Sequence, residues 1–508
     1  MRLQRSIMNM QKNSKYLSFV LIFSTFSFAQ EVKLDTVPKY SITTVSEFSS
    51  QIDDIFNDPN FNNANWGASI QSLVTGEYFY KKNENKLFMP ASNQKLVTSA
   101  VGLLLLGPMY RFKTEVYSDG VIDGSILKGD LIIKGFGDPT ISGRFNNNDM
   151  TKILRDWADS LLALGIDEIR GNILGDDNAF DDTGLGLGWS WDYESDWYAA
   201  PSGALSFNDN CIDISVKPGR KGEQGILSIS PESKYTIIQN KLRTVGRDSV
   251  TDVSVYRERG TNIISVIGSI KEGDDSLKIY ATINNPTQYF VVTLKEILQQ
   301  KGIYVSGFAS DVDDLTRTLD YARTKLLFTH YSVFLKDIIK VLNKNSQNFY
   351  AEQLLKTIGF EKKGFGSAAQ GIDVVRSTLN KIGINTDNME IVDGSGLSRL
   401  NLISPNQITV LLNYMYKSDV FTYFYNSLPV GGVDGTLANR VRKTRAQNNV
   451  RAKTGYINGV RSISGYIFTG DKEPVTFSII ANNFTVPVVL AENLQDLVCI
   501  RLANFKRK

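Results

Sequence analysis

A serine and a lysine that could act as nucleophile and base lie three residues apart in ASNQKLVTSA, residues 91–100. Residues i and i+3 share one face of a helix, so Ser92 and Lys95 should be neighbours if a helix begins here. If Ser92 were only a helix cap, Glu or Gln would be favoured at the position of Lys95, and a cation there opposes the helix dipole. Burial and the positive helix end both lower a lysine pKa, and a neutral amine beside a hydroxyl is a base beside a nucleophile.

Two further short motifs could complete a site. NKNSQNFYAE contains Ser346 and Asn348 near a predicted boundary between two helices, and VRAKTGYING contains Lys453, Thr454 and Gly455 within a predicted strand. Each motif alone is weak, because turn residues and solvated strand ends have the same composition. In chain order the three motifs read Ser-x-x-Lys, Ser-x-Asn and Lys-Thr-Gly, which is the signature set of penicillin-binding proteins and serine β-lactamases.

The segments around the motifs predict an α+β fold. A strand hairpin, GASIQSLV and EYFYKKN, precedes the Ser92 helix, which Pro90 and Gly107-Pro108 delimit. After about residue 326 the pattern becomes helical, and it ends with three β-like runs and a helix starting near Val488. The apolar run around His330, the sole histidine, also has a helical pattern. We therefore predict a split domain with an antiparallel sheet and flanking helices.

The middle of the chain has a different pattern, in which short β-like runs alternate with Asp-Gly and Pro-Gly turns. Helical stretches interrupt it near 149–164 and 286–301. We predict β-rich accessory domains inserted into the split domain. The expected divisions are a signal peptide at 1–29, a split domain at 30–111 and 326–508, an accessory domain at 112–205 and 276–325, and a second β-rich unit at 206–275. The second unit carries no motif and is expected to be dispensable for acylation.

The first 29 residues predict export. They carry four cations and no acid, and an apolar run is followed by a small-residue site, so cleavage is expected near Ala29-Gln30. Without those cations the 56 basic residues become 52 against 53 acidic ones, which gives no argument for nucleic acid. No later segment is apolar enough to predict an integral membrane segment in the mature chain. We expect an exported, periplasmic protein.

The counts of histidine and cysteine limit the chemistry. One histidine excludes a His-rich metal site, and we predict no metal and no cofactor. Only Cys211 and Cys499 are present, which is not a disulfide scaffold; they could pair or stay free.

Three further segments narrow the family: GDLIIKGFGDPTIS (129–142), DGSGLSRLNLISP (393–405) and LPVGGVDGTLANR (428–440). Ser346 follows Ser92 by 254 residues, a much longer gap than in classical β-lactamases. Nearly the whole mature chain resembles the D-alanyl-D-alanine carboxypeptidase/endopeptidase family, the low-molecular-mass class C penicillin-binding proteins. The resemblance implies that the split domain at 30–111 and 326–508 is a penicillin-binding transpeptidase-like domain and that the unit at 206–275 is nested within the accessory domain. It also implies peptidoglycan peptides as substrates and β-lactam antibiotics as inhibitors.

The resemblance also implies roles for the acylating residues. Ser92 would attack the D-Ala-D-Ala carbonyl, or that of a D-amino-acid cross-link, and form an acyl-enzyme. Lys95 would accept its proton, and Ser346 would relay a proton to the leaving amine. Backbone N–H groups of Ser92 and Tyr456 would form the oxyanion hole.

The remaining roles concern substrate binding. The resemblance implies that Asn348 holds a substrate amide, that Lys453 and Thr454 bind the terminal carboxylate, and that Gly455 lets the substrate backbone approach. Arg399 is a candidate for a substrate carboxylate, with a structural salt bridge as the alternative.

Two other functions stay open. A β-lactamase or esterase of the same superfamily would release bound penicillin rapidly, whereas a peptidase would release it slowly. A catalytically inactive binding homologue is a third possibility, and the intact motifs argue against it. The sequence leaves undecided the balance of carboxypeptidase and endopeptidase activity, the stem-peptide preference, the partners of the accessory domains and the oligomeric state.

Overall fold

The computed structural model describes residues 44–507. Its motif-bearing half is built on a five-stranded antiparallel sheet with the order β18-β19-β20-β1-β2. The strands are β1 (Asn65–Ser72), β2 (Tyr78–Lys82), β18 (Arg451–Ile457), β19 (Val460–Phe468) and β20 (Pro474–Asn482). The first and last parts of the chain meet inside this sheet, because Trp66 of β1 lies opposite Ala481 of β20.

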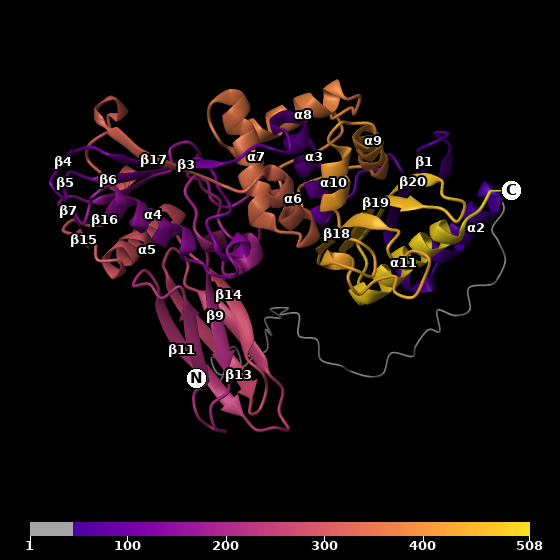
Figure 1. Cartoon of the computed structure of the whole chain (residues 1–508). Coiled ribbons are helices and arrows are strands. Elements are labelled where there is room, and N and C mark those ends of the chain that lie inside the picture. Colours follow the sequence, from indigo (N-terminus) through magenta and orange to yellow (C-terminus); the bar gives the residue numbers. More distant parts are fainter. Residues whose placement is uncertain (1–43, 508) are drawn as a thin grey trace, which may run out of the picture.

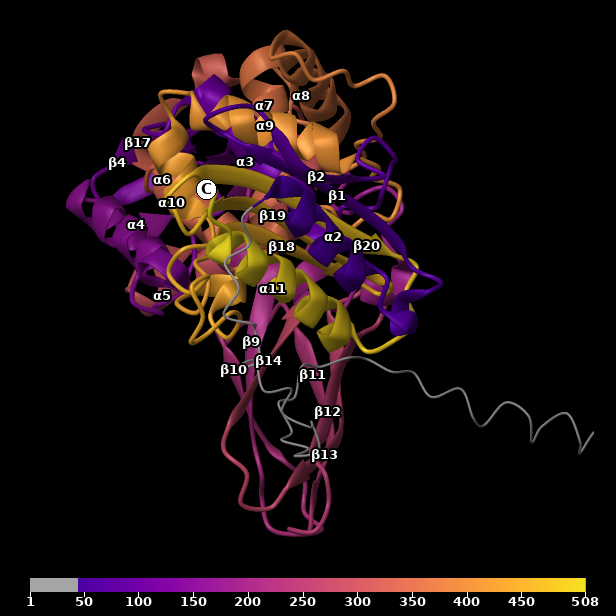
Figure 2. The ribbon, with the colours of Figure 1, turned by 90° about the vertical axis from the view of Figure 1, so that its right-hand side faces the viewer.

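Helices cover both faces of this sheet. α2 (Val45–Phe56) and α11 (Val488–Asn504) pack on one face, where Figure 2 shows them side by side. Because successive strand residues point to opposite faces, Ile479 joins the core under α2 and α11, whereas Ile480 joins the core of the helices on the other face.

The other face carries α3 (Gln94–Leu106), α6 (Leu335–Lys344), α7 (Asn348–Lys363), α8 (Ala368–Lys381), α9 (Pro405–Tyr416) and α10 (Phe421–Ser427). α3 is central to this group, and its apolar side chains from Leu96 to Leu103 are all buried. A helix that is apolar nearly all round needs partners on every side, which explains why α6, α7, α8, α9 and α10 all contact it.

The segment between α3 and α6 forms two smaller sheets, seen opposite the helical part in Figure 1. One has the order β16-β8-β6-β3-β17 and the other β15-β7-β5-β4, with α4 (Lys152–Ala163) and α5 (Pro286–Gln300) packed against them. The strands are β3 (Lys113–Ser118), β4 (Val121–Asp123), β5 (Ile126–Lys128), β6 (Leu131–Gly135), β7 (Glu168–Ile169), β8 (Ile173–Asp176), β15 (Tyr304–Val305), β16 (Ala309–Asp311) and β17 (Lys325–Tyr331).

A further pair of three-stranded sheets projects away from the rest of the molecule (Figures 1 and 2). Their orders are β10-β9-β14 and β11-β13-β12, and buried side chains such as Ile214 and Val266 fill the space between them. The strands are β9 (Cys211–Lys217), β10 (Ile226–Ser230), β11 (Ile237–Val245), β12 (Asp252–Arg257), β13 (Ile263–Lys271) and β14 (Leu277–Thr282).

The α+β class with β-rich accessory parts is confirmed, as are the hairpin, the helices near 149–164 and 286–301 and the terminal helix. The helical interpretation around His330 is wrong, because residues 325–331 form β17 and pair with β3. A partner strand about 200 residues away overrides the local pattern there. The domain limits stay a prediction, and we propose moving the limit at 326 past β17 because of this pairing.

The signal-peptide prediction concerns residues 1–29, which lie outside the described part of the chain. Among residues 44–507, no helix combines the length and the apolarity that crossing a bilayer requires.

Candidate active site

Ser92 lies in a short 3-10 turn, Ala91–Asn93, that leads into α3. The turn is fixed to the sheet, because the Ser462 hydroxyl donates to the Pro90 carbonyl at 2.6 Å. Ala91 has a φ of 47°, in the left-handed region that side chains other than glycine rarely occupy. This backbone presents Ser92, which is partly exposed, above the buried start of α3.

Lys95 lies directly below Ser92 and is fully buried. Its Nζ donates to Ser92 Oγ at 2.9 Å, to Asn348 Oδ1 at 2.5 Å and to the Ser395 carbonyl at 2.7 Å. Burial lowers the pKa of Lys95 to about 7, against the opposing charges of Asp393 and Glu352. The amine is therefore neutral in a large fraction of molecules near pH 7.

Ser346 and Lys453 form a second hydroxyl–amine pair across the site. Lys453 Nζ donates to Ser346 Oγ at 2.8 Å and to the Thr454 carbonyl at 2.6 Å. Burial, followed by repulsion from Lys95, holds the pKa of Lys453 well below its ordinary value. In the free protein burial therefore disfavours the charge that the family resemblance assigns to Lys453, and an anionic substrate would favour it.

The other motif residues line the same place. Asn348 begins α7 and donates its Nδ2 to the Tyr198 carbonyl at 2.7 Å, while Thr454 Oγ1 bonds Thr436 Oγ1 at 2.7 Å. A Cβ on Gly455 would lie 2.9 Å from the Ser92 nitrogen and 2.7 Å from the Pro90 carbonyl oxygen. Only glycine lets β18 approach the serine turn this closely.

The direction of the β18 amides bears on the predicted oxyanion hole. The Ala452 N–H donates to the Pro429 carbonyl at 3.0 Å, on the side of β18 away from β19. Backbone amides alternate along a strand, and the pairing with β19 has no register shift, so the amides of Thr454 and Tyr456 point the same way. The Tyr456 amide thus points away from β19, and its part in an oxyanion hole stays a prediction.

Two buried carboxylates near Lys95 were missed by sequence reasoning. Glu352, on α7, accepts hydrogen bonds from the amides of Gly394 and Ser395 at 3.0 and 2.8 Å. Asp393 accepts from the amides of Gly396 and Ser398, from Asn401 Nδ2 and from Trp189 Nε1. The available signals were the spacing of four from Asn348 to Glu352, which puts both on one helix face, and the turn sequence DGSG.

The middle segment of the chain also reaches the site. Besides Trp189 and Tyr198, Asp209 accepts from Nε2 of Gln347, the central residue of the Ser-x-Asn motif, at 3.0 Å. Asp209 lies within 206–275, so the expectation that this range is dispensable stays a prediction only for the part beyond Asp209.

Arg399, the two cysteines and His330 were also singled out in the sequence. Arg399 donates a hydrogen bond to the Asn458 carbonyl at 2.8 Å, at the turn after β18, and its binding of a substrate carboxylate stays a prediction. Cys211 and Cys499 are both buried and free. His330 lies 3.7 Å from the buried Asp138 and is only 21% exposed.

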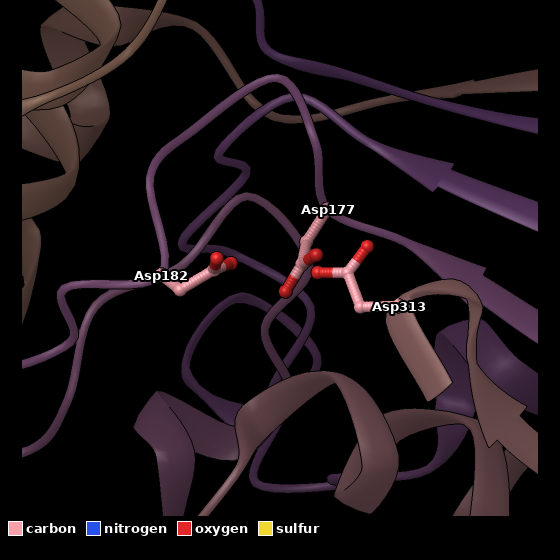
Figure 3. A group of neighbouring side chains, drawn as sticks. All are labelled: Asp177, Asp182 and Asp313. Carbon is pink, nitrogen blue, oxygen red and sulfur yellow. The ribbon is translucent and has the colours of Figure 1, made fainter. Parts of the chain in front are cut away.

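One acidic group is the described region's candidate for holding a cation. Carboxylate oxygens of Asp177, Asp182 and Asp313 lie within 4.8 Å of one another and point together in Figure 3. Thr287 donates to Asp177, and burial raises the pKa of Asp177 to about 6. A pKa of about 6 leaves Asp177 mostly ionised at pH 7. The group belongs to the inserted segment rather than to the motif residues.

Comparison with known proteins gives consistent matches. The sequence profile of the D-Ala-D-Ala carboxypeptidase 3 (S13) family matches residues 48–501. A D-alanyl-D-alanine carboxypeptidase of Actinomadura sp. (strain R39) is 32% identical over 91% of this chain and 85% of its own. The carboxypeptidase DacB of Haemophilus influenzae is 27% identical over 85% and 90%. The fold matches crystalline penicillin binding protein 4 of H. influenzae with a TM-score of 0.76 at 24% identity, covering 89% and 97% of the two chains.

Proposed function

The chain belongs to the D-Ala-D-Ala carboxypeptidase 3 (S13) family, and from this premise we propose an exported serine D-Ala-D-Ala carboxypeptidase and/or D,D-endopeptidase of peptidoglycan. Its substrates would be stem peptides and their cross-links, cleaved through an acyl-enzyme on Ser92. One observation carries the assignment: the buried amine of Lys95 contacts the hydroxyl of Ser92, a partly exposed residue, at 2.9 Å.

In the acylation step, Ser92 Oγ attacks the carbonyl carbon of the penultimate D-alanine while its proton passes to Lys95. A neutral Lys95 can donate to Asn348 and Ser395 and still direct its lone pair at Ser92, which is the arrangement that a general base needs. The negative charge on the carbonyl oxygen would be held by the amides of Ser92 and Tyr456.

Departure of the terminal D-alanine requires a proton on its nitrogen. Ser346 would supply this proton, and Lys453, which contacts its hydroxyl and is charged while the substrate carboxylate is bound, would replace the proton and become neutral. Collapse of the tetrahedral intermediate then breaks the C–N bond and leaves the ester on Ser92. Lys453 and Thr454 would bind the carboxylate of the leaving residue, and Asn348 an amide of the stem peptide.

Water completes the cycle by attacking the ester carbonyl carbon. Its proton would pass through Ser346 to the neutral Lys453, and Lys95 would return its proton to Ser92 Oγ as the ester bond breaks. In an endopeptidase reaction the leaving amine is the side-chain nitrogen of a neighbouring stem peptide, and the same groups serve. Gly455 keeps β18 free of a side chain where the extended substrate would lie against the Ser92 turn.

β-Lactams would acylate the same serine, because the strained lactam presents a similar amide to the nucleophile. The superfamily alternative, a β-lactamase or esterase, needs a base that activates water quickly. Glu352 and Asp393 are buried and their oxygens accept hydrogen bonds from N–H groups, which supports a peptidase with slow deacylation.

The cellular site is proposed from the signal-peptide pattern and from the peptidoglycan substrate. Both favour export to the periplasm, with the mature chain beginning near Gln30.

A direct test combines a fluorescent penicillin with purified peptidoglycan fragments. We expect one covalent adduct, mapped by mass to Ser92, and mass loss of one alanine or release of a cross-link from the fragments. An adduct on another residue, or no adduct on folded protein, would overturn the assignment, and rapid turnover of the penicillin would favour the β-lactamase. The fragment masses separate carboxypeptidase from endopeptidase activity.

A further inference from the structure

A buried carboxylate lies one helical turn beyond a residue that contacts Lys95. Glu352 follows Asn348 by four positions on α7, so both face the start of α3. Its side chain is 5% exposed, and that of Asp393 is completely buried. Carboxylates are rarely buried without a specific partner, because removing a charge from water is costly.

The hydrogen bonds of Glu352 determine where a neighbouring carbonyl points. Its two oxygens hold the amides of Gly394 and Ser395, and the Ser395 carbonyl accepts from Lys95 Nζ at 2.7 Å. The Gly394 carbonyl accepts from Thr98 of α3 at 2.7 Å. The segment 394–395 is therefore attached to α7 through its amides and to α3 through its carbonyls.

We propose that Glu352 is a positioning residue for the reaction: its hydrogen bonds aim the Ser395 carbonyl at the Lys95 amine, and its charge compensates the buried cation that forms when Ser92 gives up its proton. The inference rests on the proposed function, because it concerns the amine that takes this proton. No atom of Glu352 needs to touch the substrate.

The charges around the amine define what Glu352 contributes. Lys95 faces Glu352 on α7, Asp393 in the loop after α8 and the amine of Lys453 on β18, whose charge is disfavoured by burial. Asp393 accepts four hydrogen bonds from N–H donors, one of them from Trp189. Burial and then Asp393 raise the pKa of Glu352 to about 7, so Glu352 and Lys95 titrate in the same range. Each ionised partner favours the ionised form of the other, and the pair titrates as a unit.

The test is the penicillin acylation rate of the full mature chain against pH, for wild type and Glu352→Gln. Glutamine is uncharged and offers one oxygen for two amides, so we expect the alkaline plateau to fall about tenfold. We also expect the midpoint of the acidic limb to move about one pH unit lower, because Lys95 loses an opposite charge. A purely structural role would reduce the rate equally at every pH, and that result would overturn the proposal.

Two variants and one spectroscopic measurement sharpen the result. Glu352→Asp keeps the charge, but its side chain is too short to reach both amides. The plateau of the acylation rate should therefore fall, while the midpoint of the acidic limb stays near that of wild type. A midpoint shifted as in Glu352→Gln would contradict the charge argument. Glu361→Gln is a matched control on the same helix, where the exposed carboxylate accepts from Tyr110, and it should leave the profile unchanged.

The Lys95 amine can also be titrated directly by NMR in protein labelled at the lysine side-chain nitrogens. Its pKa should fall in Glu352→Gln and stay in Glu361→Gln. This readout separates the two hypotheses: a wild type that binds no penicillin refutes the proposed function, whereas an acylating wild type with an unchanged Lys95 pKa in Glu352→Gln refutes the role of Glu352.

Discussion

Protonation of Lys95 should control the pH dependence of acylation. With a pKa of about 7, about half of the Lys95 amines are neutral at pH 7 and about one in ten at pH 6. At the ordinary value of 10.5 the neutral fraction at pH 7 would be about one in three thousand. The sign follows directly: falling pH protonates the base, so the acylation rate falls on the acidic side.

Two substitutions test this reasoning. Lys95→Arg keeps a cation but removes the base, since a guanidinium does not lose its proton in this range. General-base catalysis is typically worth about 10²- to 10⁴-fold, so both Lys95→Arg and Lys95→Ala should lose that much acylation rate. In Lys95→Ala, Asn348 Oδ1 and the Ser395 carbonyl each lose a hydrogen-bond donor, which costs about 1–3 kcal/mol of folding free energy per acceptor. Removal of the amine, whose burial is itself unfavourable, offsets part of this cost, so the variant should stay folded.

The assay is the second-order rate constant for penicillin acylation between pH 5 and 9, followed by intact mass, with circular dichroism as the check of folding. Wild type should show half of its plateau rate near pH 7. Near-wild-type acylation by folded Lys95→Arg, or a wild-type rate that does not change with pH, would refute the neutral-amine mechanism and return the role of base to another group.

Other substitutions test the remaining contacts. Gly455→Ala places a methyl group against Ser462 Oγ and the Ser92 turn, closer than two atoms can approach, so acylation should fall at least about 100-fold while the circular dichroism spectrum stays unchanged. Replacing residues 216–277 with a two-residue turn, which keeps Asp209, should retain penicillin labelling; loss of labelling in a folded variant would contradict the accessory role. Asp209→Ala in the full chain should slow acylation several-fold by loosening the Ser-x-Asn motif, measured by the same mass assay. Trp189→Phe removes the N–H that donates a hydrogen bond to Asp393, so the free energy of unfolding should fall by about 1–3 kcal/mol and the thermal midpoint should fall with it.

The sequence predicted best what is encoded over a few residues. Ser92 and Lys95 are adjacent because one helical turn separates them, and the hairpin and the helix after Pro487 follow from local turn and periodicity signals. The strand around His330 was missed because its partner, β3, is about 200 residues away.

The same limit explains the missed site residues. Trp189 and Asp393 meet across 204 residues, and Asn348 and Tyr198 across 150. Such contacts depend on how the inserted segment packs against the split domain. A local sequence pattern contains no information about that packing. Glu352 was closer to prediction, because its spacing from Asn348 was visible but its burial was not.

The pairing of β1 with β20 has a consequence for the order in which the protein is made. Strand β1 cannot pair with β20 before Ala481 has been synthesised, so the central sheet cannot close until nearly all of the chain is present. The inserted strands need no such delay, because β3 and β17 lie within the segment and Phe112 and Ser332 are bonded to each other at its base. Early folding of this segment would shorten the loop between β1 and β20 by about half, which saves only about 0.6 kcal/mol of closure entropy. Its larger effect would be kinetic: a folded insert would bring α3 and α6 together before β18 to β20 are added, and these last strands would then complete the helical core. In that order of folding, Lys453 on β18 would join Ser92 last, and the site would have no activity before then.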